Sequence, residues 1–335
     1  MRKTTMAQGG IALAFALALA ACSTGTPTAP SGTGSSSASG GADGAKPNIA
    51  FIQGVIGDNF YISMECGVRA AADEFGAEIS VQGPQKWDPA LQQPVLTSVQ
   101  ASSPDAILIA PNDITAMQRP LEEAAKVSKV VLVDTSVEDP SFAVSTISSD
   151  NLGGGTAAFE ALKGLIPDGG KVLVLDNQPG ISTTDARVKG FEDAVAQDAS
   201  FEYIGVEFHK NQPAEAAKFV TATLAAHPDL KGVFATNIFG AEGAATGIQQ
   251  AGVAGKVQVV GFDAGPAQVA ALKDGTVQAI IAQQPYDIGY QGVQQALAAL
   301  NGEETTSEIQ TGFSIVTMDN LETDEGQQAL YASEC

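Results

Sequence analysis

The chain has 335 residues, and its 17 Lys and Arg against 38 Asp and Glu give a formal net charge of −21. At about 150 residues per domain, this length favours two domains. The acidic balance argues against nucleic acid as a partner, because such binding depends on Lys and Arg that neutralise phosphates. Only two His and three Cys are present. That is too few for most zinc sites. The sequence implies neither a metal nor an organic cofactor.

The first residues have the pattern of an export signal. Arg2 and Lys3 precede an apolar run at 11–21, which is shorter than the roughly 20 residues of a membrane-spanning helix. The run ends Leu19-Ala20-Ala21-Cys22 and resembles the lipobox of bacterial lipoproteins. The resemblance implies a signal peptide at 1–21, lipidation of Cys22, and anchoring to the outer face of the cell membrane or its periplasmic side. A plain secretory signal with an incidental Cys is the alternative.

Residues 22–45 are nearly all Ser, Thr, Gly, Ala and Pro after the cysteine. Such side chains offset little of the entropy lost on ordering, so we expect a flexible linker between the lipid and the folded part.

From residue 48 onward, short apolar runs alternate with longer amphipathic stretches, as in α/β proteins. The runs predict strands at 49–53, 79–82, 106–110, 130–134, 144–148, 172–176, 203–207, 232–236, 257–262, 279–283 and 310–317. The stretches between them predict helices that include 60–75, 114–128, 154–165, 184–197, 214–226 and 286–300. Several strands are continuously apolar, which is typical of parallel strands buried on both faces. So many strands favour two doubly wound domains with parallel sheets.

Ligands of such folds bind beyond the carboxyl ends of the strands. The residues found there are mostly amides and carboxylates: 53–59, 111–113, 134–135, 150–151, 176–177, 237, 263 and 283–284. These groups can bridge adjacent hydroxyls, and Phe60, Tyr61 and Trp87 can cover an apolar C–H face. The pattern predicts a pocket for a small neutral sugar or polyol. Two alternatives remain: helix N-caps for Asp150, Asn151 and other members, and surface packing for Trp87.

Six segments together resemble the ribose/galactose-type periplasmic sugar-binding proteins that serve ABC transporters. They are 56–61, 105–113, 149–154, 233–237, 259–263 and 281–285. The resemblance spans about residues 47–317 and implies two Rossmann-like domains joined by a three-segment hinge, a type I periplasmic binding protein. It implies a first lobe at 46–149 plus 285–307 and a second lobe at 150–284 plus 308–317. A tail at 318–335 follows.

The same resemblance supplies a ligand set by position. Its members are Asp58, Phe60, Tyr61, Asp134, Asn237, Asp263 and Gln283, whereas Arg187 matches a more structural arginine. Three positions depart from the ribose binders. The ribose binders have Asn where this chain has Ala110, and they have Arg where this chain has Thr135 and Asp185. Thr135 and Asp185 therefore stay in the predicted site, but with a hydrogen-bond complement that does not suit ribose.

Cys66 and Cys335 remain once Cys22 is lipidated, which permits one disulfide. Export favours the bridge, which would fasten the acidic tail to the first helix. A buried thiol at Cys66 and a free one at the terminus are the alternative.

Other functions fit the residues less well. Gly153-Gly154-Gly155 could open a helix as an anion cradle, yet the chain contains neither a Walker sequence nor a G-x-S-x-G elbow. We therefore expect no enzyme. A lactose-repressor-type regulator would require a basic DNA-reading module, which does not precede residue 48. A monomeric solute-binding lipoprotein that serves a permease is the expected function. A ligand sensor presented to a membrane receptor is the alternative.

Overall fold

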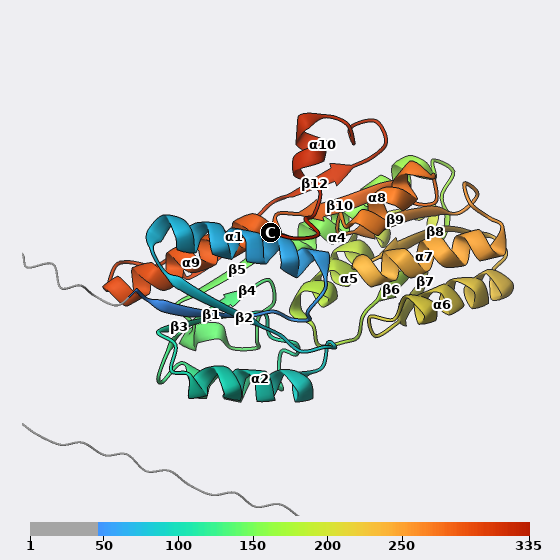
Figure 1. Ribbon diagram of the computed structural model, residues 1–335. Coiled ribbons are helices and arrows are strands. Elements are labelled where there is room, and N and C mark those ends of the chain that lie inside the picture. The colour runs from blue at the N-terminus through green and yellow to red at the C-terminus, as the bar shows by residue number, and fades with distance from the viewer. Residues whose placement is uncertain (1–45) are drawn as a thin grey trace, which may run out of the picture. The chain divides into compact units, whose positions relative to one another are not determined.

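Continuous apolar runs form the central strands of two six-stranded sheets (Figure 1). The structure is a computed structural model that describes residues 46–335. The proposed signal peptide, Cys22 and the Ser/Gly/Thr-rich stretch lie outside the described residues. Each buried strand presents apolar side chains to helices on both faces, as parallel sheets require.

The first sheet has the strand order β11-β5-β4-β3-β1-β2, and all its pairings are parallel. Its strands are β1 (Asn48–Ile52), β2 (Glu78–Gln82), β3 (Ala106–Ile109), β4 (Lys129–Val133), β5 (Ser145–Ser149) and β11 (Glu308–Thr311). Its helices are α1 (Asn59–Phe75), α2 (Pro89–Ala101), α3 (Gln118–Ala124) and α9 (Pro285–Asn301). We call this sheet and its helices the first lobe.

The second sheet has the corresponding order β12-β10-β9-β8-β6-β7, and only β12 runs antiparallel to its neighbour. Its strands are β6 (Gly170–Asp176), β7 (Phe201–Phe208), β8 (Leu230–Ala235), β9 (Gln258–Phe262), β10 (Ala279–Gln283) and β12 (Phe313–Val316). Its helices are α4 (Asn151–Leu165), α5 (Ser182–Val195), α6 (Pro213–Ala226), α7 (Ile238–Ala251) and α8 (Pro266–Lys273). These elements form the second lobe. The predicted α/β fold with two parallel-dominated sheets is confirmed.

Local signals set the helix ends that matter for the site. The Asp58 side chain accepts a hydrogen bond from the Phe60 N–H and begins α1. Gly76 ends α1 in the left-handed conformation at φ 78°. Helices α1 and α9, far apart in sequence, pack against each other on one face of the first sheet (Figure 1).

The chain passes between the lobes three times: after β5, after β10 and between β11 and β12. Side chains join these crossings. The Ser149 hydroxyl donates to Gln283 Oε1 at 2.8 Å and lies 3.4 Å from the Thr311 hydroxyl. The Asp150 N–H also donates to the Thr311 carbonyl at 2.9 Å. The three segments therefore form one hydrogen-bonded hinge.

The third crossing differs from the sequence-based expectation. Residues 310–317 were expected to form one strand of the second lobe, with the lobe boundary before residue 308. The structure instead has β11 pairing with β5 in the first sheet and β12 pairing with β10 in the second, with Gly312 between them. One extended segment serves as the edge of both sheets, and its alternating pattern gives no sign of the change of partner.

The C-terminal segment after β12 contains α10 (Asp324–Gln328) and ends on α1. A disulfide joins Cys335 to Cys66 with their Cα atoms 5.2 Å apart, as the sequence predicted. Between residues 46 and 335, no helix has both the length and the apolar character needed to cross a bilayer.

Candidate functional site

A pocket opens between the two lobes at the carboxyl ends of their strands. Its void volume is about 390 Å³, part of it open to solvent. The lining residues are Asp58, Phe60, Tyr61, Trp87, Asp134, Asn177, Ile181, Thr183, Thr184, Arg187, Asn211, Asn237, Asp263 and Gln283. Eight of the ten ligand residues predicted from the sequence are in this set. Carboxylates of both lobes, aromatic rings of the first lobe and amides of the second lobe therefore converge on one space.

Asp134 follows β4 and carries the carboxylate of the first lobe. It is 6% exposed, and the Tyr61 hydroxyl donates to its Oδ2 at 2.6 Å. Burial raises the pKa of Asp134 to about 6, although the Tyr61 hydrogen bond and the charge of Arg187 oppose that rise. Burial and the neighbouring Asp134 charge raise the pKa of Tyr61 well above its ordinary value. Tyr61 therefore stays protonated and remains a donor.

Asp263 follows β9 and carries the carboxylate of the second lobe. Its Oδ1 accepts hydrogen bonds from Gln283 Nε2 at 2.7 Å and from the Tyr331 hydroxyl at 3.1 Å. Its Oδ2 accepts from the Ile238 N–H at 3.2 Å. Burial raises the pKa of Asp263, while Arg187 and these donors oppose the rise. Because Gln283 also accepts from Ser149 of the hinge, this carboxylate is fixed by groups from several segments.

Asp58 and Asn237 act as helix N-caps and also line the pocket. One Asp58 oxygen accepts from the Phe60 N–H at 2.9 Å, and Asn237 Oδ1 accepts from the Gly240 N–H at 2.9 Å. Asn237 Nδ2 donates to Asn211 Oδ1 at 2.7 Å. Desolvation, followed by the charge of Asp263, raises the pKa of Asp58 to about 7. The capping alternative and the pocket prediction are therefore compatible for both residues.

Three aromatic rings cover the side of the pocket that belongs to the first lobe. Phe60 and Tyr61 meet edge to face at a centroid distance of 5.2 Å, and Tyr61 and Trp87 stack at 6.3 Å. The Trp87 indole N–H donates to the Asn112 carbonyl at 2.9 Å, which orients the ring. A Cβ on Gly54 would collide with the Trp87 and Tyr61 rings, so the absence of a side chain there makes room for the stack. Trp87 thus lines the pocket and does not pack on the outer surface.

Arg187 is the only cation among the lining residues and is 2% exposed. Its Nε donates to Asn151 Oδ1 at 2.9 Å and its Nη1 donates to the Thr236 carbonyl at 2.8 Å. Its guanidinium lies 3.8 Å from the centre of the Phe262 ring. These contacts fix the guanidinium in the wall of the pocket, and its positive charge opposes the rise in the pKa of both Asp134 and Asp263. The structural role expected for Arg187 stays a prediction.

Sequence reasoning missed several lining residues of the second lobe. Asn177 had been noted at the end of a strand, but Ile181, Thr184 and Asn211 carry no comparable signal. The Asn177 Oδ1 atom is buried and has no hydrogen-bond partner within residues 46–335. Asn177 lines the pocket, so a hydroxyl group bound there would satisfy this oxygen.

Thr135 and Asp185 are the two predicted site residues that the structure leaves outside the lining. The Thr135 hydroxyl donates to the Pro111 carbonyl at 2.8 Å. The Asp185 carboxylate accepts from the Gly180 N–H at 2.9 Å and so closes the loop before α5. Both side chains are used by nearby backbone groups, and a ligand role for them stays a prediction.

The features considered for other functions have structural roles. Asp150 is the N-cap of α4 and accepts from the Gly153 N–H at 2.9 Å, so its carboxylate occupies the helix end proposed as an anion cradle. The Asn151 amide donates to the Ser149 carbonyl. Among residues 46–335, no group of three or more His, Cys, Asp and Glu could hold a metal ion.

Comparison with known proteins gives concordant matches. A sequence model described as "Periplasmic binding protein domain" matches residues 49–304. The ribose import binding protein RbsB of Salmonella typhimurium is 31% identical over 272 residues, which cover 81% of this chain and 91% of that protein.

Two solved structures from Agrobacterium vitis share the fold. One, an ABC transporter solute-binding protein bound to α-D-tagatopyranose, is 41% identical with a TM-score of 0.84 and covers 86% of this chain and 100% of its own. The other, bound to D-fucose, is 30% identical with a TM-score of 0.81 and covers 85% and 100% of the two chains.

Proposed function

The chain belongs to the periplasmic binding protein family, and from this premise we propose that it captures a small neutral sugar or polyol between its lobes. It then delivers that ligand to an ABC transporter permease. The relatives are named as import and transporter binding proteins, which favours uptake over sensing or catalysis. One observation carries the choice of ligand: Asp134 and Asp263, from different lobes, line the same pocket as three aromatic rings.

The chemistry of the pocket favours a neutral, hydroxyl-rich ligand. Asp58, Asp134 and Asp263 supply acceptors, and Asn237 and Gln283 supply both donors and acceptors. Phe60, Tyr61 and Trp87 supply flat apolar faces for the C–H side of a sugar ring. Three carboxylates against the single guanidinium of Arg187 disfavour a ligand that carries a negative charge. Sugar acids should therefore be rejected.

Closure of the lobes is the proposed mechanism. Ligand contacts that come from both lobes can form together only when the lobes approach, so they stabilise the closed arrangement relative to an open one. The hydrogen-bonded crossings at Ser149, Gln283 and Thr311 would act as the hinge. The closed shape is what the permease would recognise.

A thermal-shift and calorimetry panel tests the ligand class. D-Tagatose, D-fucose, D-ribose, other pentoses and hexoses, sugar alcohols and inositols are compared with D-galacturonate as a charged control. At least one neutral member should raise the melting temperature by mass action, and the acid should not. Binding of only the acid, or of no member, would contradict the proposal. Loss of uptake of the bound sugar on gene deletion would separate transport from sensing.

We further propose that Cys22 is lipidated after removal of residues 1–21, and that the protein is an anchored monomer. The family supports export, and the lipobox-like sequence before Cys22 supports the anchor. Mass spectrometry of the mature N-terminus and detergent-phase partitioning of a Cys22→Ser variant test the anchor. A mature protein that lacks the lipid mass on Cys22 would refute it. Analytical ultracentrifugation tests the monomer.

A further inference from the structure

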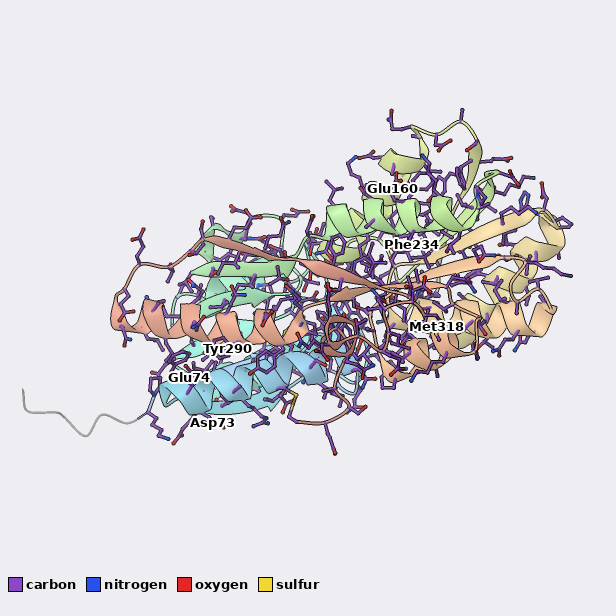
Figure 2. All side chains as sticks on the ribbon, turned by 90° about the horizontal axis from the view of Figure 1, so that it is seen from above. Asp73, Glu74, Glu160, Phe234, Tyr290 and Met318 are labelled. Carbon is purple, nitrogen blue, oxygen red and sulfur yellow. A yellow bond between two sulfur atoms is a disulfide. The ribbon has the colours of Figure 1, made fainter. Side chains whose placement is uncertain are left out.

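The C-terminal segment 319–335, which we call the strap, bridges the two lobes. It leaves the second lobe after β12 and ends in the disulfide between Cys335 and Cys66 of α1, whose sulfurs form a yellow bond in Figure 2. Two more hydrogen bonds fix its end on α1. Asn59 Nδ2 donates to the Ala332 carbonyl at 3.0 Å, and the Ala332 N–H donates to the Ser63 hydroxyl at 2.8 Å.

Tyr331 is the strap residue that reaches the binding site. It is 7% exposed, and its ring lies 6.0 Å from that of Phe60 in the first lobe. Its hydroxyl accepts from the Gln283 N–H at 2.9 Å and donates to Asp263 Oδ1 at 3.1 Å. Its own N–H donates to the Ala264 carbonyl at 3.0 Å. One residue of the strap thus contacts two elements of the second lobe and an aromatic residue of the first.

The arrangement has a counterpart in the first lobe. There the Tyr61 hydroxyl donates to Asp134, but Tyr61 belongs to the helix that follows the first strand of the same lobe. In the second lobe the equivalent donor comes from the strap. The match to the family sequence model ends at residue 304, so the strap lies outside that match.

We propose that the strap completes the ligand site: the Tyr331 hydroxyl positions the Asp263 carboxylate, and the Cys66–Cys335 disulfide holds Tyr331 in place. The proposal rests on the proposed function, because the consequence is a change in sugar affinity. Tyr331 is a positioning residue, since it is not among the residues that line the pocket. Affinity should therefore depend on a residue and a covalent bond that the ligand does not touch.

The test compares Tyr331→Phe with a matched surface control, Tyr290→Phe. Tyr290 also donates its hydroxyl to a carboxylate, Glu74 Oε2, at 2.6 Å, but on the outer side of α9 and α1 (Figure 2). Calorimetry uses D-tagatose and every panel sugar that binds. Loss of a hydrogen bond to a charged group should weaken binding by Tyr331→Phe about tenfold and by Tyr290→Phe less than about twofold. Equal affinities of wild type and Tyr331→Phe would overturn the proposal.

A second readout does not require ligand. Because the Tyr331 hydrogen bond favours the ionised carboxylate, its loss should raise the pKa of Asp263. Carbon-13 NMR titration of the Asp263 carboxyl in the ligand-free protein measures this shift, with Asp134 as the internal reference. An unchanged Asp263 titration would refute the positioning role. If no sugar binds wild type, the proposed function fails, while this titration still decides the link between Tyr331 and Asp263.

The role of the disulfide is tested by a double-mutant cycle. Cys66→Ser with Cys335→Ser should weaken sugar binding about tenfold in the wild-type background, similar to the loss of a hydrogen bond to a charged group. In a Tyr331→Phe background, the same two cysteine substitutions should weaken sugar binding much less, because both changes act through one contact. An equal loss in both backgrounds would show that the disulfide does not act through Tyr331.

Discussion

Asp134 and Asp263 occupy equivalent positions in the two lobes. Each follows the fourth strand of its lobe, and each has a left-handed backbone, with φ of 64° and 76°. The N–H of each donates to the next strand, to Ile147 at 2.8 Å and to Ile281 at 2.9 Å. Left-handed φ is uncommon outside glycine and gathers at functional sites. Each lobe thus directs one carboxylate toward the shared pocket through a left-handed residue at the end of its fourth strand.

Asp263→Ala should weaken sugar binding by about 2 kcal/mol or more, because a ligand hydroxyl and several protein donors lose their acceptor. Asp263→Asn should lose less, since Asn tolerates the left-handed backbone and keeps one acceptor oxygen. Calorimetry measures both. Asp193→Ala, an exposed position on α5, is the control. Wild-type affinity in Asp263→Ala would remove Asp263 from the site.

Stability of the ligand-free protein should fall as pH rises from 4 to 7. Asp134 has its pKa raised by burial from 3.8 to about 6, so in this interval the folded state holds a proton that the unfolded state has released. The free energy of unfolding therefore decreases with pH. In Asp134→Asn, the free energy of unfolding should decrease less between pH 4 and 7, by roughly 2–3 kcal/mol. This follows from about 1.4 kcal/mol for each unit of pKa shift.

Urea denaturation at several pH values measures this effect. Asp193→Asn serves as an exposed carboxylate control. An Asp134→Asn curve parallel to that of wild type would contradict the assignment.

Sugar affinity should rise between pH 5 and 8. The pKa of Asp58 is raised to about 7 and that of Asp134 to about 6, so both are largely protonated at pH 5 and largely ionised at pH 8. Ligand hydroxyls that donate to these groups favour the ionised forms, and binding therefore releases protons. Calorimetry at pH 6.5 in phosphate and in imidazole, which differ in ionisation enthalpy, should give different apparent enthalpies. Tighter binding at pH 5 would mean that the carboxyl groups act as donors.

Removal of the disulfide by Cys66→Ser with Cys335→Ser should lower the free energy of unfolding by about 2–4 kcal/mol. The bridge closes a loop between residues 269 positions apart, so it restricts the unfolded chain strongly. Denaturation without ligand, followed by circular dichroism, measures the effect. The single variant Cys335→Ser should be equally destabilised. Unchanged stability in both variants would show that the disulfide does not stabilise the folded protein.

Gly155→Ala should destabilise the second lobe by about 1–3 kcal/mol through overpacking. A Cβ on Gly155 would collide with the backbone carbonyl of Arg187, where α4 and α5 cross. Gly164→Ala in the same helix meets no atom within 4 Å. It should be neutral or stabilising, because Ala favours a helix over Gly by up to about 1 kcal/mol. Equal effects of the two substitutions would contradict the close-packing explanation.

Much of the fold could be predicted because strands buried on both faces are continuously apolar in sequence. The run Val130-Val131-Leu132-Val133 is apolar throughout and forms a central parallel strand. The polar residue that follows such a run, Asp134 or Asp263, stands at the edge where ligands bind. Strand position thus fixes the place of these carboxylates without knowledge of the other lobe.

The rest depends on contacts that no local pattern encodes. Gly312 separates strands of two different sheets, but the flanking residues alternate as in a single strand. Asp185 sits at the start of a helix near the pocket, yet the Gly180 N–H captures its carboxylate. Tyr331 lies in an acidic tail more than 60 residues after Asp263, and only the cross-link and the folded chain bring them together.

The covalent attachment also sets a geometric limit on lobe separation. Tyr331 is bound to the second lobe at Ala264, and Cys335, four positions later, is bonded to the first. Four residues extend over roughly 14 Å at most. While Tyr331 stays hydrogen-bonded to the second lobe, this short segment of the strap limits the separation of the two lobes near α1. A wider opening would require the hydrogen bond between Tyr331 and Asp263 to break. Ligand release and detachment of Tyr331 from the second lobe would then occur together.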